Sequence, residues 1–270
     1  LERSEVMFAD DEAIVAAVER VIAPLGLRID RASPADDARL ADGSRLHAVI
    51  PPASVDGPIV AVRRFSEAVT DLAALVDGGG ITSSGAELLR TAVASRLNLL
   101  IAGGTGAGKT TLLNVLSKEI DSHERTVTVE DAAELRLEGH VVRLEARPPN
   151  PEGAGEITVR SLLRHALRLR PDRIGVGEVR GPEALDMIQA MSTGHDGSMS
   201  TIHANGPEEA LWRLESLATT ADSGASVDTL RRQIRSAVDR VVFVARRPEA
   251  RVVASICEVS TDGITEVYSC

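Results

Sequence analysis

The stretch GGTGAGKT at residues 103–110 has the residue types and the spacing of a phosphate-binding loop. It satisfies the pattern G-x-x-x-x-G-K-[ST], in which glycines let successive backbone N–H groups surround phosphate oxygens. In that pattern Lys109 reaches the terminal phosphates and the hydroxyl of Thr110 holds Mg²⁺. A glycine-rich turn without a ligand is the plain alternative, but the apolar run NLLIA precedes the loop and a helical pattern follows it.

The loop therefore predicts binding of a nucleoside triphosphate. The residues expected to contact it are Gly103, Gly104, Thr105, Gly106, Ala107, Gly108, Lys109, Thr110 and Thr111.

A glutamate at the end of a second apolar run could supply the chemistry of hydrolysis. The segment RPDRIGVGEVRG, residues 170–181, predicts a strand that ends at Glu178 and a glycine-punctuated turn after it. A carboxylate in that place could orient and deprotonate an attacking water. The alternative is a strand-end acid that makes a surface ion pair with Arg180.

Three further acids follow another predicted strand in TVEDAAEL, namely Glu130, Asp131 and Glu134. The carboxyl ends of parallel strands meet at one edge of a sheet, so these acids could hold Mg²⁺ through water beside the phosphate loop. An acidic cap at the start of a helix is the alternative, because acids are favourable at a helix N-terminus.

Arginines recur every four residues in VRSLLRHALRLRPDR, with Arg160, Arg164 and Arg168 opposite an apolar face. The spacing predicts a helix that ends at Arg170, before Pro171. A solvated stripe is one interpretation. The other is that these arginines, or Arg143 and Arg147 in RLEARPPN, reach a triphosphate across a subunit boundary, a contribution of about 10³ to 10⁵ in rate where it occurs.

Two histidines, His195 and His203, stand in STGHDGSMSTIHANG. A zinc site needs three or four protein ligands. Cysteines and acids at ligand spacing do not accompany this pair, so the sequence argues against zinc.

The elements that carry these residues fall into two groups. Residues 1–76 predict a small α+β domain, 77–83 a glycine-rich linker that includes DGGG, and 84–270 an α/β domain. In the first domain we expect a helix at 11–22, strands at 27–31, 38–41, 45–50 and 59–65, with a turn at Asp42-Gly43, and a helix at 67–76.

In the second domain a capping box of Ser84 and Glu87 predicts a helix through Arg96. Strands and helices then alternate, as in a parallel sheet, and the final runs predict an antiparallel extension. The strands are expected at 98–102, 126–130, 140–146, 173–178, 198–204, 240–247, 251–259 and 264–269.

Composition restricts the function further. The 270 residues are 43% hydrophobic, carry a net charge of −10 and contain 2% aromatic residues, which argues against a nucleic-acid partner. Apolar runs are far shorter than the roughly 18 residues of a membrane span, so we expect a soluble cytosolic protein. The two cysteines, Cys257 and Cys270, fit a reducing compartment. Because the chain begins at Leu1, we expect the natural N-terminus to lie upstream.

In order and spacing, GGTGAGKTT, TVEDAAEL, LRLRPDRIGVGEVRG and STGHDGSMSTIHAN resemble the Walker A, Asp, Walker B and His boxes of the secretion ATPases of type II and type IV secretion and pilus assembly. The stretch from Glu145 to Ile174 is most similar to the tight-adherence, or Flp pilus, branch and its type IV secretion relatives. The resemblance covers about Leu40 to Val244. It implies a PAS-like N-terminal domain and a RecA-like P-loop NTPase domain, assembled as a hexamer with ATP and Mg²⁺ at the interdomain cleft.

The resemblance also implies roles for single residues. Glu178 would be the catalytic acid, Glu130, Asp131 and Glu134 the Asp box, and His195 and His203 would approach the γ-phosphate. The arginines expected to face the nucleotide are Arg63, Arg64, Arg147 and Arg160.

The family function is ATP hydrolysis by a ring-forming motor that powers pilus assembly or protein secretion. Such a motor docks on an inner-membrane platform protein and is peripheral at the cytoplasmic face. The chain departs from the family in a shortened start and in lacking the tetracysteine module of the general-secretion branch. Two alternatives remain open: a RecA-like DNA motor, and a nucleotide-gated assembly factor with little turnover.

Overall fold

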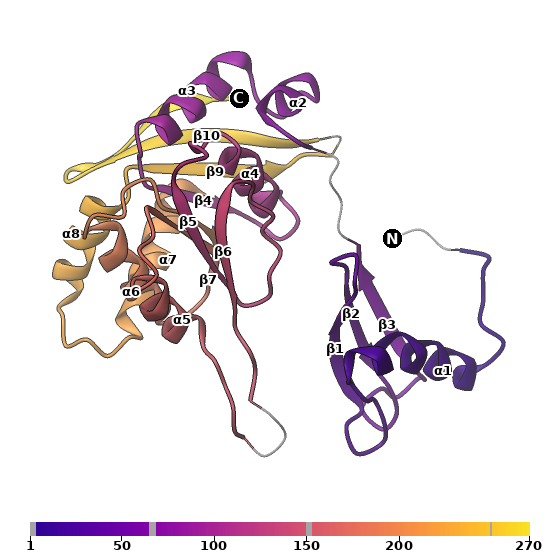
Figure 1. The fold of residues 1–270 in the computed structure, drawn as a ribbon. Coiled ribbons are helices and arrows are strands. Elements are labelled where there is room, and N and C mark those ends of the chain that lie inside the picture. Colours follow the sequence, from indigo (N-terminus) through magenta and orange to yellow (C-terminus); the bar gives the residue numbers. More distant parts are fainter. Residues whose placement is uncertain (1–3, 65–68, 150–152, 249) are drawn as a thin grey trace. The chain divides into compact units, whose positions relative to one another are not determined.

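A computed structural model describes residues 4–64, 69–149, 153–248 and 250–270. The chain forms two compact units, Leu1–Ala68 and Val69–Cys270 (Figure 1). The expected linker at 77–83 lies inside the second unit, where the Gly80 carbonyl accepts a hydrogen bond from the Val253 N–H at 2.8 Å. The division thus comes before the glycine-rich stretch, because that stretch is bound to a strand of the second unit.

The first unit packs a helix on a three-stranded antiparallel sheet of order β1-β2-β3. Asp10 caps the helix by accepting a hydrogen bond from the Ala13 N–H at 2.8 Å. The buried core is formed by Val18, Ile22, Ile29, Ala38, Leu46, Ala48 and Ile50. The elements are α1 (Asp11–Ile22), the 3-10 helix η1 (Ala23–Leu25), β1 (Ala35–Arg39), β2 (Arg45–Val49) and β3 (Ile59–Arg63).

In this unit the predicted hairpin around Asp42-Gly43 is confirmed, and the strand predicted at residues 27–31 is wrong. β1 and β2 pair antiparallel around Gly43, which has a φ of +87°. Residues 27–31 form no strand, because the Asp30 carboxylate accepts hydrogen bonds from the N–H groups of Ala32 and Ser33 and turns the chain. The start expected for the next helix, at Glu67, lies outside the described residues.

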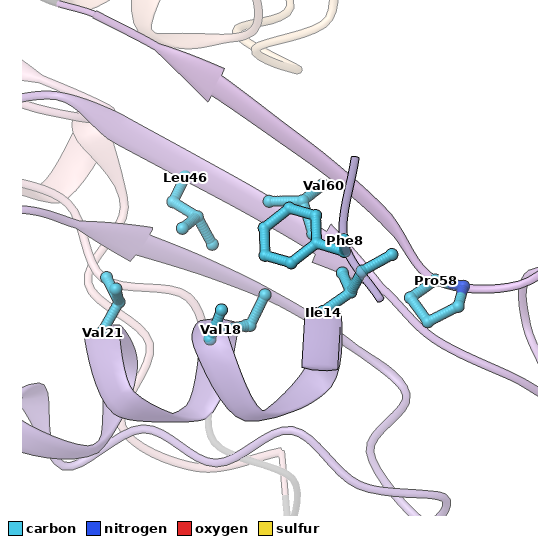
Figure 2. Close-up of a pocket in the computed structure, with 8 residues that line it drawn as sticks. Phe8, Ile14, Val18, Val21, Leu46, Pro58 and Val60 are labelled. Atoms are coloured by element: carbon cyan, nitrogen blue, oxygen red, sulfur yellow. The ribbon is translucent and has the colours of Figure 1, made fainter. Parts of the chain in front are cut away.

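A hollow of about 390 Å³ lies between α1 and the sheet of the first unit (Figure 2). The described residues that line it are all apolar, unlike the charged and polar groups that bind phosphate. Its lining is Phe8, Ile14, Ala17, Val18, Val21, Leu46, Pro58 and Val60.

The second unit is built on an eight-stranded sheet of order β11-β10-β9-β4-β8-β7-β5-β6. Its strands are β4 (Leu99–Gly103), β5 (Arg125–Glu130), β6 (His140–Glu145), β7 (Arg173–Val179), β8 (Met199–His203), β9 (Arg240–Arg246), β10 (Arg251–Ser260) and β11 (Gly263–Ser269). Its helices are α2 (Leu72–Asp77), α3 (Ser83–Ala94), α4 (Lys109–Ser117), α5 (Val159–Ala166), α6 (Glu183–Met191), α7 (Pro207–Thr219) and α8 (Val227–Ala237).

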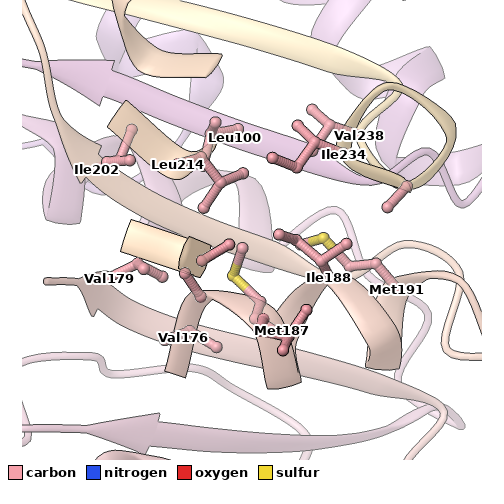
Figure 3. Packing of buried hydrophobic residues seen from close by; sticks show 14 of the residues in the cluster. Leu100, Val176, Val179, Met187, Ile188, Met191, Ile202, Leu214, Ile234 and Val238 are labelled. Atoms are coloured by element: carbon pink, nitrogen blue, oxygen red, sulfur yellow. The ribbon is translucent and has the colours of Figure 1, made fainter. Parts of the chain in front are cut away.

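Helices cover both faces of this sheet. Side chains of α5, α6, α7 and α8 form one core with β4, β5, β7 and β8. Figure 3 shows the part of it where α6, α7 and α8 meet β4, β7 and β8. Side chains of α2, α3 and α4 form a second core with β4, β9 and β10. Every residue of β4 is buried, which explains why that strand is uniformly apolar.

The predicted α/β sheet is confirmed as mainly parallel, with one correction at its antiparallel extension. β4, β5, β6, β7, β8 and β9 are parallel to their neighbours among themselves, and β10 and β11 are antiparallel. The antiparallel extension therefore begins after β9, which itself continues the parallel sheet beside β4. Figure 1 shows β9 and β10 side by side in this sheet.

Two helix boundaries differ from the predictions. Thr82, not Ser84, caps α3, because its side chain accepts a hydrogen bond from the Gly85 N–H at 3.2 Å. α5 ends at Ala166 and not at Arg170, and Arg170 takes a φ of +54° before Pro171. Among the described residues, no helix combines the length and the apolar character needed to span a membrane.

Candidate active site

The phosphate loop connects the end of β4 with the start of α4. Gly106 and Gly108 have φ values of +70° and +104°, which L-residues with a side chain rarely adopt. A Cβ on Gly103 would lie 2.5 Å from the Val244 carbonyl oxygen. These three glycines are thus required by backbone geometry, and the loop has the strand–loop–helix setting that the sequence predicts.

Lys109 folds its side chain back over the loop. Its Nζ donates hydrogen bonds to the carbonyl oxygens of Gly103 at 2.9 Å and Gly104 at 3.2 Å. The same Nζ lies 3.6 Å from Oε1 of Glu178, and the lysine is 9% exposed. The ammonium group is therefore held at the point where the loop and the end of β7 meet.

The strand register brings the predicted site residues to one edge of the sheet. Gly103 pairs with His203 across β4 and β8, and Val179 pairs with Ile202 across β7 and β8. Glu130 is the last residue of β5, which is parallel to β7. Lys109, Glu178, His203 and the acids after β5 therefore share the carboxyl-terminal edge, where open α/β sheets bind their ligands.

Glu178 is held by two cations. Oε2 accepts a hydrogen bond from Nε of Arg180 at 2.6 Å, and Nη2 of Arg180 contacts the same oxygen. Nη1 of Arg180 reaches Oδ2 of Asp131 at 3.5 Å. The ion pair with Arg180, which is the structural interpretation of Glu178, is therefore present. Glu178 also lies close to Lys109 of the phosphate loop, as a role in hydrolysis requires.

Glu130 is buried, and only one of its two carboxylate oxygens accepts hydrogen bonds. Oε1 accepts hydrogen bonds from the N–H groups of Glu134 and Leu135, both at 2.8 Å, and Oε2 is buried without a hydrogen-bond partner. Burial raises the pKa of Glu130 to about 7, although the two backbone hydrogen bonds oppose the shift. No helix follows at 131–139, so the alternative of an acidic helix cap is wrong.

His195 lies away from this edge. It precedes β8, with Nδ1 3.2 Å from the Ala190 carbonyl oxygen, and its own carbonyl accepts a hydrogen bond from Oγ of Ser198 at 2.6 Å. Ser198 Oγ in turn accepts from the N–H of Ile174, near the start of β7. His195 thus belongs to the amino-terminal edge of the sheet, and the expectation that it approaches the phosphates is wrong.

Arg160 and Arg164 of α5 both form ion pairs with one carboxylate on α6, that of Asp186. Nε of Arg160 is 2.7 Å from Oδ2 of Asp186, and Nε of Arg164 is 3.1 Å from Oδ1. These two arginines tie α5 to α6 instead of forming a freely solvated stripe. Nε of Arg147 donates to the Gly155 carbonyl at 2.9 Å. Arg63 ends β3 in the first unit and Arg64 follows it.

Arg251 contacts the phosphate loop, although the sequence analysis did not predict it as a site residue. Arg251 begins β10, and its Nε donates a hydrogen bond to the Gly106 carbonyl inside the phosphate loop at 2.9 Å. The order of the strands could have predicted its position, because β9 ends at the carboxyl-terminal edge and the next antiparallel strand must begin there. No local motif marks this arginine.

These features define a P-loop nucleoside triphosphatase: a mainly parallel α/β sheet, a lysine held by a glycine-rich loop, and a strand-end glutamate beside that lysine. The chain belongs to the family of type II/IV secretion system proteins, whose family model matches residues 2–267. The family resemblance is thereby confirmed, and the chain is an ATPase of this secretion-system class.

Similar proteins come from several bacteria. A Mycobacterium tuberculosis protein named for conjugal transfer is 45% identical over 253 residues, covering 91% of this chain and 71% of that protein. The type IV secretion system protein PtlH of Bordetella pertussis is 37% identical over 236 residues, covering 78% of this chain and 69% of that protein. The VirB11 ATPase from the Brucella suis type IV secretion system has a TM-score of 0.59 and 28% identity, covering 92% and 80% of the two chains.

Proposed function

We propose that this chain is the ATP-hydrolysing subunit of a motor that drives pilus assembly, conjugal transfer or protein secretion across the inner membrane. The observation that carries the hydrolytic part is the 3.6 Å separation between Nζ of Lys109 and Oε1 of Glu178. It places a carboxylate at the mouth of the phosphate loop. The names of the relatives support the motor part, since one is named as a conjugal transfer protein and another as a type IV secretion system protein.

The residues of the loop would bind the triphosphate. Backbone N–H groups from Gly104 to Thr111 would surround the β-phosphate, and Lys109 would turn from its carbonyl partners toward the terminal phosphates. Glu178 would then accept a proton from the attacking water. Its Oε1 is suited to this, because 3.6 Å from Lys109 is longer than a hydrogen bond and leaves that oxygen free to accept one.

The oxygen donors at this edge fit Mg²⁺. Thr110 is the second residue of α4, and Asp131 and Glu134 follow β5 with their carboxylates. Hydroxyl and carboxylate oxygens are the ligands that Mg²⁺ prefers, usually together with water and phosphate. Thr110 would hold the ion directly and the acids through water, and the ion would neutralise charge on the phosphate oxygens.

The assembly that completes the site is a homo-hexamer. In it the first unit is a PAS-like domain and the second a RecA-like domain of the Flp-pilus branch. Arg63, Arg64, Arg147 and Arg160 would face the nucleotide of the same or a neighbouring subunit, and His203 would respond to the γ-phosphate. Arg160 would first have to break its ion pair with Asp186, so it has the least structural support of these four arginines. The ring would act at the cytoplasmic face through an inner-membrane platform protein.

Turnover and binding of three variants test the hydrolytic role. Glu178→Gln is expected to bind ATP and lose most turnover, and Lys109→Ala to lose ATP binding in calorimetry. Glu266→Gln, an exposed acid on β11, is the matched control and should behave as wild type. Normal turnover by Glu178→Gln would remove that residue from the role of base.

Solution mass with and without ATP and Mg²⁺ tests the ring. A hexamer is expected with nucleotide, and a monomer under all conditions would contradict the assembly. Stimulation of turnover by DNA would favour a DNA motor, and ATP binding without turnover in the wild type would favour an assembly factor.

A further inference from the structure

β7 carries a bulge at the residue that we place in the role of base. Val176 of β7 pairs with Ser200 of β8, yet Val179 pairs with Ile202. Gly177 and Glu178 therefore stand opposite the single residue Thr201. A bulge of this kind bends the strand and redirects a side chain, and bulges are over-represented beside active sites.

The hydroxyl of Thr201 closes the bulge. Its Oγ1 donates a hydrogen bond to the Gly177 carbonyl oxygen at 2.6 Å, and the threonine is 1% exposed. A bulge interrupts the ladder of hydrogen bonds between two strands, so backbone carbonyl groups beside it take other donors. Thr201 supplies such a donor from its side chain to the half-buried Gly177, and β8 thereby fixes the direction in which the next peptide of β7 leaves Gly177.

The other neighbouring strand confines the same glycine. A Cβ on Gly177 would lie 2.8 Å from Cγ of Glu130. Glu130 cannot easily move aside, because its Oε1 holds the N–H groups of Glu134 and Leu135. β5 and β8 flank β7 in the sheet, so the backbone just before Glu178 is held from both strands.

We propose that Thr201 is a positioning residue for hydrolysis, whose hydroxyl fixes the bulge at Gly177 and so aims the Glu178 carboxylate at the phosphate loop. The proposal rests on the proposed function, since it takes Glu178 as the base. Thr201 does not touch the nucleotide in this account. Its loss should leave ATP affinity intact and lower only the rate of the chemical step.

Three threonine variants separate this role from simple packing. Thr201→Val keeps the shape and removes the hydroxyl, and we expect kcat to fall ~10- to 100-fold with the Kd for ATP within about twofold, because small misplacements of a reacting group can cost ~10²-fold. Thr201→Ser keeps a hydroxyl and should restore most of kcat. Thr128→Val is the matched control, because Thr128 is also buried in the sheet but its Oγ1 has no hydrogen-bond partner.

A double variant tests whether Thr201 acts through Glu178. In the Glu178→Gln background, Thr201→Val should cause little further loss in single-turnover rate, because the group that it positions is already gone. An equal loss in both backgrounds would overturn the proposal and leave Thr201 a packing residue. Wild-type kcat in Thr201→Val would overturn it as well.

Gly177→Ala keeps the test open if Thr201→Val does not fold. The added methyl group must displace Glu130 or the β7 backbone, and we expect the same fall in kcat with ATP binding retained. Wild-type kcat in Gly177→Ala would contradict the proposal. Failure of the proposed function would look different, since Glu178→Gln alone would then turn over normally.

Discussion

Arg251 donates a hydrogen bond from Nε to the carbonyl oxygen of Gly106 at 2.9 Å, although 145 positions separate the two residues. Its Cδ lies 3.5 Å from where a Cβ of Gly108 would be. The phosphate loop is thus supported from outside by the first residue of β10. Because the loop binds phosphate through N–H groups that point inward, a carbonyl held on the outside helps to keep it in the binding conformation.

Arg251→Ala should therefore weaken ATP binding. One hydrogen bond to the loop contributes about 1 kcal/mol, so we expect the Kd to rise ~3- to 10-fold with kcat little changed. Calorimetric titration with ATP measures the effect. Arg246→Ala, at the exposed position that pairs with Arg251 on β9, serves as control, and equal losses in both variants would indicate a general charge effect.

Glu130 makes stability fall as the pH rises. Burial raises its pKa from 4.5 to about 7, so between these values the folded protein keeps a proton that the unfolded chain has released. The free energy of unfolding should fall across this range by about 3 kcal/mol and level off above pH 7. Denaturant unfolding at pH 5 and pH 8 measures it, and Glu130→Gln should lose this part of the pH dependence.

The buried Arg173 forms an ion pair with the partly buried Glu124 near the start of β7. Nε and Nη2 of Arg173 each lie 2.8 Å from one oxygen of Glu124, and Arg173 is 2% exposed. Glu124→Ala would leave that buried cation without its acidic partner, with only the carbonyl oxygens of Val93 and Gly197 as acceptors, at a cost of about 3 kcal/mol in urea unfolding. Glu87→Ala, from an exposed pair with Arg90, should change stability little, and equal effects would contradict this view.

The same pair predicts acid sensitivity of the opposite sign to that of Glu130. The hydrogen bonds from Arg173 are the largest cause that holds the pKa of Glu124 below 4.5. The stability that they provide is present above that value and is lost as the pH falls further. Comparison of wild type with Glu124→Gln in acid unfolding checks the direction, and identical acid profiles would argue against it.

His203 and His195 should differ in turnover. His203 pairs with Gly103 beside the phosphate loop, whereas His195 lies at the other edge of the sheet. We expect His203→Ala to lower kcat ~10-fold or more, within the range for loss of a polar group that acts on the reacting atoms. His195→Ala should retain kcat within about twofold. Similar losses in both would contradict the placement of His195.

Local pattern predicted the elements of the sheet better than the positions of single side chains. β4 is readable because a strand buried on both faces must be apolar throughout, and the loop after it because glycine and lysine have fixed roles there. His195 and His203 look like one pair in sequence, but β8 separates them, so they lie at opposite edges. The strand expected at 27–31 failed because the Asp30 carboxylate binds two nearby N–H groups and makes a turn.

The contacts that pass between distant segments could not be predicted in this way. Thr201 meets Gly177 only because β7 is bulged against β8, and position 177 has no room for a Cβ because the Glu130 side chain of β5 occupies that space. Arg251 meets Gly106 only because the last hairpin returns to the carboxyl-terminal edge. Such contacts depend on strand order and register, which no single motif in the chain encodes.

The outer strands of the two sheets are unequally protected against aggregation. β6 exposes the charged or polar side chains of His140, Arg143 and Glu145, which discourage an incoming strand from another molecule. β3, an outer strand of the three-stranded sheet, exposes Ile59, Val60 and Val62 instead. Of these two strands, β3 is therefore the more prone to unwanted strand addition in concentrated solution, and Val62→Lys would oppose it.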